Sequence, residues 1–183
     1  MSPNGLFVTV GASETADLNQ IGTSADGSTW AVATDVGGLF SGGGQAYGNG
    51  IAYGLVNGVG TFVAVGTSAT AANQIGTSLD GLTWKVATDV GSLFSGGYGI
   101  GITYGLVNGV GTFVAVGYGD TAGNRIGTSL DGSTWTVATN IGSLFSEGQG
   151  RGIAYGLVNG VGTFVAVGGS DTAANQIGTS LDG

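Results

Sequence analysis

Residues 51–88 read IAYGLVNGVGTFVAVGTSATAANQIGTSLDGLTWKVAT. Two apolar segments, Ile51–Val56 and Thr61–Val65, flank the dipeptide Asn57-Gly58. Both residues of an Asn-Gly pair tolerate positive φ, which is typical of the two-residue turn of a β-hairpin. These residues therefore predict two antiparallel strands joined by a tight turn.

The same stretch contains a second pair of short segments, Gln74–Ser78 and Thr83–Thr88, around Asp80-Gly81. Asp-Gly is also a turn signal, so these segments predict two further antiparallel strands. Gly66–Asn73 is expected to be a loop between the two hairpins, and Asp89–Gly101 to be a loop that leads on to the next unit. One unit is therefore expected to be a sheet of four strands.

This unit is repeated along the chain. Ile51, Ile102 and Ile153 begin near-identical segments spaced by 51 residues, and Trp84 and Trp135 have the same spacing. Trp30 precedes Trp84 by 54 residues, so the first copy carries an insertion of about three residues. Most residues match between adjacent copies, which indicates recent duplication or design.

The given sequence does not begin and end at the boundaries of the repeated unit. The first copy is expected to lack the first strand and the last copy to lack the fourth. We expect one repeat array over residues 1–183, with these divisions: an incomplete first blade over 1–50, full blades over 51–101 and 102–152, and an incomplete last blade over 153–183.

The segments 24–30, 78–84 and 129–135 share the pattern Ser-x-Asp-Gly-x-Thr-Trp. They resemble the Asp-box of sialidase-type, BNR-like β-propellers, whose usual pattern has one more residue between Asp and Gly. The resemblance covers nearly the whole chain, because it includes the preceding Tyr-Gly and Phe-Val-Ala-Val-Gly segments. It implies an all-β fold, a β-propeller built from tandem four-stranded antiparallel blades. A β-solenoid is the competing fold, but its parallel strands do not suit the hairpin turns.

The Asp-box residues are expected to be structural. An Asp carboxylate can accept backbone N–H bonds across its own turn, and a Trp ring can cover the hairpin and bury apolar area. This role is assigned to the following residues: Asp26, Trp30, Asp80, Trp84, Asp131, Trp135 and Asp182. Phe40, Phe94 and Phe145 are expected to pack between blades.

The composition argues against several classes of partner. The chain has 41 glycines, no cysteine, no histidine and a formal net charge of −8. Its only cations are Lys85, Arg125 and Arg151. Nucleic acid and anionic membranes are therefore not expected partners, because binding to phosphate needs many neutralising cations. No signal peptide is recognised at Met1, and the localisation stays open, with an extracellular or recombinant protein favoured.

The residues needed for common catalytic sites are missing from the sequence. Without His or Cys, neither a Ser-His nor a Cys-His nucleophile can form, and no zinc site is expected. A sialidase would need a cluster of arginines, and the chain has two. We therefore expect no catalytic residues, no metal and no cofactor.

Candidate ligand contacts come from the segments that vary between copies. The turns of sequence Leu-Val-Asn-Gly-Val-Gly are identical in all three copies, whereas the loops at the other end of the strands vary. Loops on a rigid scaffold commonly carry function, although they also tolerate neutral drift. The candidates, whose aromatic, amide and charged groups would suit a glycan, are Tyr47, Tyr98, Tyr118, Asp120, Glu147, Gln149 and Arg151.

The sequence thus predicts a non-enzymatic β-propeller repeat module, either a binding module, with a glycan as one ligand class, or a structural scaffold. The alternatives are a fragment of a sialidase-like glycan hydrolase, or an engineered or recently duplicated propeller with no ligand. The incomplete end blades would leave unpaired strand edges. We therefore expect the chain to associate with copies of itself to complete a ring, with a dimer as the first choice.

Overall fold

The computed structural model describes residues 5–13, 20–42 and 46–183. Every regular element in this part of the chain is a β-strand or a short 3₁₀ turn, and it contains no α-helix. The prediction of an all-β fold is therefore confirmed. In the same residues, no helix is long and apolar enough to cross a membrane.

The strands of the described residues form four separate antiparallel sheets, each in chain order. The first sheet consists of β1 (Phe7–Val10), β2 (Ile21–Ser24) and β3 (Ala31–Val32). The second consists of β4 (Tyr47–Val56), β5 (Val59–Thr67), β6 (Ile75–Ser78) and β7 (Lys85–Val86). The third consists of β8 (Tyr98–Val107), β9 (Val110–Tyr118), β10 (Ile126–Ser129) and β11 (Thr136–Val137). The fourth consists of β12 (Gln149–Val158), β13 (Val161–Gly169) and β14 (Ile177–Ser180).

The Asn-Gly turns form as their chemistry requires. Asn57 has φ 50° and Gly58 has φ 82°, and Val56 pairs with Val59 across the two-residue turn. Positive φ at both central residues matches the right-handed twist of the flanking strands. The longest hairpin of each full sheet, β4–β5 or β8–β9, is closed in this way.

The first strand of the second, third and fourth sheets is longer than predicted. β4, β8 and β12 begin at Tyr47, Tyr98 and Gln149, which were expected to lie in loops. In β4 the additional pairing joins Tyr47 to Thr67, and a register shift between Gly48 and Gly50 interrupts it. A β-bulge of this kind inserts an unpaired residue and lets pairing continue beyond it. In the sequence these glycines suggest loops, but in the structure they flank the β-bulges of the strands.

The fourth strand is shorter than predicted: β7 is only Lys85–Val86, not Thr83–Thr88. Thr83 forms a parallel bridge to Asp35, and the Trp84 N–H donates to the Asp35 carbonyl at 2.8 Å. These residues therefore bond to the segment that follows the preceding sheet. The first two sheet-to-sheet junctions are built partly from such links, since Thr134 forms the same parallel bridge to Asp89.

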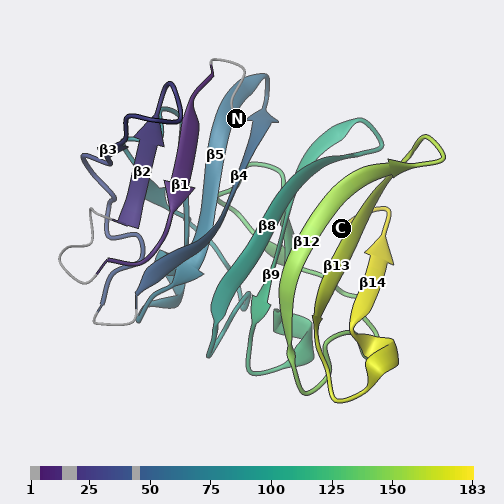
Figure 1. Cartoon of the computed structure of the whole chain (residues 1–183). Helices are drawn as coiled ribbons and strands as arrows, with labels where there is room; N and C mark the ends of the chain where they lie inside the picture. Colours follow the sequence, from purple (N-terminus) through teal and green to yellow (C-terminus); the bar gives the residue numbers. More distant parts are fainter. Residues whose placement is uncertain (1–4, 14–19, 43–45) are drawn as a thin grey trace.

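Successive sheets lie face to face along the chain (Figure 1). The strand β8 contacts β4 on one side and β12 on the other, while the first and fourth sheets lie at opposite ends of the array. The loops before β6, β10 and β14 each contain a 3₁₀ turn: η2 (Ala71–Gln74), η3 (Ala122–Asn124) and η4 (Ala173–Asn175).

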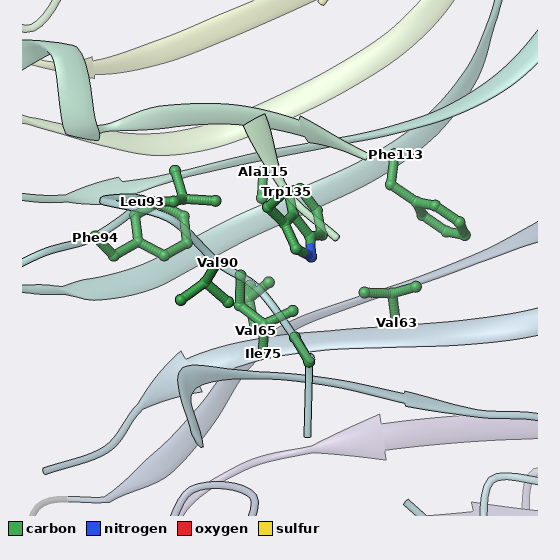
Figure 2. Close-up of a cluster of buried hydrophobic side chains, with 10 residues drawn as sticks. Val63, Val65, Ile75, Val90, Leu93, Phe94, Phe113, Ala115 and Trp135 are labelled. Atoms are coloured by element: carbon green, nitrogen blue, oxygen red, sulfur yellow. The ribbon is translucent and has the colours of Figure 1, made fainter. Parts of the chain in front are cut away.

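Each junction between sheets contains an apolar cluster. Figure 2 shows the second one, in which Val65 and Ile75 of the second sheet face Trp135 and Ala115 of the third. Trp84 occupies the equivalent place in the first cluster, beside Ile21 and Leu39. The predicted packing of Phe40, Phe94 and Phe145 between sheets agrees with this arrangement, since all three are fully buried cluster members.

Candidate functional site

The Asp-Gly turn before each fourth strand is held together by its own side chains. Asp80 Oδ1 accepts the backbone N–H groups of Leu82 and Thr83 at 2.8 Å each. The Ser78 Oγ accepts the Gly81 N–H at 2.8 Å. The Trp84 indole N–H donates to the Gly81 carbonyl at 2.9 Å, so the ring is fixed over the turn. The turns at Asp26 and Asp131 have the same bonds.

These hydrogen bonds favour the charged form of each aspartate. The Thr29 and Ser28 N–H groups, with the Ser24 hydroxyl, lower the pKa of Asp26 to about 2. At Asp80, burial acts to raise the pKa, but bonds from Thr83, Leu82 and Ser78 outweigh it and lower the pKa below its ordinary value.

Asp131 has the same lowered pKa for the same reasons, with the effect of burial opposed by Thr134, Ser133 and Ser129. Each of these carboxylates is thus engaged by its own turn. Among the described residues, no group of three or more Asp, Glu, His or Cys side chains could hold a metal ion.

Three of the predicted ligand contacts lie at the ends of neighbouring strands: Tyr98 begins β8, Tyr118 ends β9, and Gln149 begins β12. Tyr98 pairs with Tyr118 across β8 and β9, with ring centroids 5.9 Å apart. The Tyr98 hydroxyl donates to Gln149 Oε1 of the neighbouring sheet at 3.3 Å. Three of the predicted residues therefore form one aromatic and amide cluster, which we call the tyrosine cluster. Tyr118 is its most accessible member, with 37% of the side chain exposed.

The other predicted residues lie elsewhere at the same end of the sheets. Tyr47 occupies in β4 the place that Tyr98 occupies in β8, and pairs with Thr67. Arg151 is the bulge residue of β12 and is exposed. The Asp120 carboxylate covers Gly96, where a Cβ would overlap it. Glu147 lies in the connection before β12 with φ 54°. No side-chain bond in the described residues joins these four to the tyrosine cluster.

Sequence reasoning missed Arg125, which contacts the tyrosine cluster. Its guanidinium lies 5.8 Å from the Tyr118 ring centroid, within the range of a cation–π contact. The side chain is almost fully buried and donates to the carbonyls of Gly119 and Phe145. The signal was available, because Gln74 and Gln176 hold the equivalent position in the adjacent copies.

One cavity of the described residues lies away from this cluster, between the third and fourth sheets. Its volume is about 530 Å³, and Ile126, Leu144, Phe164 and Ala166 contribute to its apolar lining. Its rim is polar, with Thr139, Asn140 and Asp182 among the lining residues. A volume and lining of this kind can accommodate a large aromatic group.

Comparison with known proteins gives no family for the chain. No protein-family model matches it, and neither the curated proteins nor the solved structures contain a significant match.

Proposed function

We propose that this chain is a non-enzymatic, BNR-like β-propeller module that associates with copies of itself through exposed apolar residues of its first and last sheets. The support comes from the first two junctions, which repeat one set of contacts around Trp84 and Trp135, and from the two end sheets. The end sheets present the same apolar positions without a neighbouring sheet in the described residues.

The exposure of equivalent residues carries this proposal. The Trp30 side chain is 46% exposed, whereas Trp84 and Trp135 are 1% and 4% exposed. At the other end of the array Ile177 is 65% exposed, although the equivalent Ile75 is 1% exposed. Large apolar side chains left uncovered at positions built for burial typically mark an interaction surface.

Light scattering on matched variants would test self-association. The parent chain should show a mass above that of one copy, rising with concentration. Ile177→Asp should reduce this association strongly, because it places a charge on a surface that would become buried. Leu181→Asp is the control, since Leu181 is 61% exposed and the equivalent Leu79 and Leu130 are also exposed within the array. A parent mass of one copy at every concentration would reject the proposal.

A glycan-binding role for the tyrosine cluster is the second candidate function. The accessible ring of Tyr118 offers an aromatic surface, and the Gln149 amide, which accepts a bond from the neighbouring Tyr98, offers a hydrogen-bonding group. Such a combination suits the apolar face and the hydroxyl groups of a sugar. A glycan array should then give hits that Tyr118→Ala abolishes. Leu106→Ala, at the opposite end of β8, should leave them unchanged.

A further inference from the structure

One position of the repeat carries a buried polar side chain in each of the first three copies. Gln20 and Gln74 are 4% and 3% exposed, and the equivalent Arg125 is 6% exposed. The Gln20 amide N–H donates to the Ala46 carbonyl at 2.8 Å. The Gln74 amide N–H donates to the equivalent Gly97 carbonyl at 2.6 Å. Both glutamines are thus fixed to the segment that leads into the next sheet.

The amide oxygens of the two glutamines have no hydrogen-bond donor. Gln20 Oε1 and Gln74 Oε1 are buried, and no described residue donates to either of them. Buried polar atoms are nearly always paired, and an unpaired one commonly marks the place of a bound water or ion. The same oxygen is unpaired at the same position in two copies, so the feature belongs to the repeated unit.

Arg125 fills this position differently in the third copy. Its Nε–H donates to the Gly119 carbonyl at 3.2 Å, and a terminal N–H donates to the Phe145 carbonyl. The guanidinium therefore bridges an oxygen of its own sheet and an oxygen of the following connection. A guanidinium has donors and no acceptor, so this side chain leaves no oxygen without a partner.

The equivalent carbonyls beside Gln74 lack these donors. Ser68 and Phe94 stand 51 residues before the two residues whose carbonyls Arg125 binds, and both are buried. The Phe94 carbonyl accepts the Gly97 N–H at 2.9 Å and receives no second bond from a described residue. No described residue donates to the Ser68 carbonyl. The second copy therefore has three buried oxygens with unused bonding capacity where the third copy has one guanidinium.

The backbone around the two positions is the same, so equivalent places are being compared. Phe94 and Phe145 have left-handed φ angles of 57° and 58°. Their N–H groups both donate at 2.8 Å to equivalent asparagine carbonyls of the next sheet. The Ser68 and Phe94 carbonyls therefore border the place that the guanidinium occupies in the third copy, and the shorter Gln74 side chain ends beside it.

We infer that the second copy binds a monovalent cation, K⁺ or Na⁺, at this place, coordinated by Gln74 Oε1 and the carbonyls of Ser68 and Phe94. We call these three oxygens the carbonyl site. Carbonyl oxygens can replace the hydration shell of such an ion. A water molecule has two hydrogens and can donate to only two of the three oxygens, whereas an ion contacts all three. The guanidinium of Arg125 places a positive charge at the equivalent position.

The charge of the surroundings favours a monovalent ion over a divalent one. Asp120 and Glu147 lie close in sequence to the carbonyls that Arg125 binds, but their equivalents near the carbonyl site are Ala69 and Gly96. Calcium sites usually include carboxylates. The carbonyl site is neutral, while the net charge of −8 attracts cations to the chain as a whole. The inference goes beyond the proposed function and does not depend on self-association or glycan binding.

Anomalous X-ray diffraction from crystals grown in rubidium chloride tests the inference directly, because Rb⁺ replaces K⁺ and gives an anomalous signal. A peak should lie within coordinating distance of Gln74 Oε1 and the carbonyls of Ser68 and Phe94. No peak is expected beside the Arg125 guanidinium. A water molecule without anomalous signal at the carbonyl site, or an empty site, would overturn the inference.

Urea denaturation measures the same binding in solution. The midpoint of urea unfolding should rise with KCl concentration and level off, relative to choline chloride at equal ionic strength, because an ion that binds only the folded chain stabilises it. Gln74→Arg supplies a guanidinium in place of the ion and should reduce this rise. Gln176→Arg is the control, since it adds the same charge where the amide oxygen is not a buried unpaired atom, and it should keep the rise.

Gln74→Glu separates ion binding from packing. It keeps the oxygen and adds a negative charge, so a lower KCl concentration should give half of the maximal rise. If Gln74→Glu lowers the midpoint and KCl does not restore it, the site does not bind the ion. A K⁺-dependent rise that Gln74→Arg leaves unchanged would contradict the inference equally. The proposed self-association is measured by mass, so none of these results decides it.

Discussion

Trp30 and Trp84 occupy the same position in the same local sequence, yet one is exposed and the other is buried. Their indole N–H groups make the same bond, to Gly27 and to Gly81. The local turn therefore forms in both places without help. What differs is the preceding sheet, which supplies Ile21 and Leu39 to Trp84. In this array, the turn is encoded within one unit and the burial is supplied by the neighbour.

Replacing these two tryptophans with alanine should give the largest difference in the free energy of unfolding. Trp84→Ala should reduce the free energy of unfolding by about 3–5 kcal/mol, because it leaves a cavity in a closed junction. Trp30→Ala should cost less than about 1 kcal/mol in dilute solution, where its ring is half exposed. Urea denaturation of both variants measures the difference. Equal losses would mean that the junctions do not depend on the neighbouring sheet.

Two equivalent glycines test the same difference by adding a side chain instead of removing one. A Cβ at Gly54 would overlap the Tyr104 ring of the next sheet, whereas a Cβ at Gly156 meets nothing within 4 Å. Gly54→Ala should therefore destabilise by about 1–3 kcal/mol through overpacking. Gly156→Ala should change stability by no more than about 0.5 kcal/mol. Thermal unfolding would show whether the two diverge, and a large loss at Gly156 would contradict the open face.

The aspartates should show a smaller difference. Asp80→Ala should cost about 1–2 kcal/mol, since two backbone N–H groups lose their acceptor. Among the described residues, the Asp182 carboxylate accepts a bond from Ser180 alone, so its loss should matter less. Urea denaturation again measures both losses, and an effect at Asp182 as large as that at Asp80 would contradict the structural role of the turn bonds.

The lowered pKa values predict a modest sensitivity to acid. The pKa of Asp26 is about 2, and those of Asp80 and Asp131 also lie below the ordinary value of 3.8. Groups with a depressed folded pKa stabilise the fold above the unfolded pKa, and this contribution is lost as pH falls through the folded pKa. The urea concentration at which half of the protein is unfolded should therefore decrease as the pH is lowered from about 4 towards about 2. Asp80→Asn should reduce that fall, and an unchanged slope would argue against these bonds.

Local features of the fold were predictable because they depend on short sequence signals. Asn57-Gly58 and Asp80-Gly81 marked the hairpins, and the three- and four-stranded sheets followed from the spacing. The start of β4 at Tyr47 was not predictable, because Gly48 and Gly50 read as loop residues until pairing with β5 is known. The brevity of β7 likewise depends on the bonds of Thr83 and Trp84 to the preceding connection.

The tyrosine cluster was predicted only in part, for the same reason. Tyr98, Tyr118 and Gln149 were chosen because they vary between copies, but their contact depends on pairing across β8 and β9 and on the neighbouring β12. Arg125 was overlooked although it stands where the adjacent copies have Gln74 and Gln176, and its contact with Tyr118 is known only from the fold.

Fluorine NMR of the chain labelled with fluorotryptophan tests most directly whether the neighbouring sheet supplies the burial of each tryptophan. Trp30→Phe would assign the Trp30 signal. In dilute solution we expect one solvent-sensitive signal from Trp30 and two protected signals from Trp84 and Trp135. As concentration rises, the Trp30 signal should become protected in step with the increase in mass. A Trp30 signal that is protected at every concentration, or that stays solvent-sensitive while copies associate, would contradict the account.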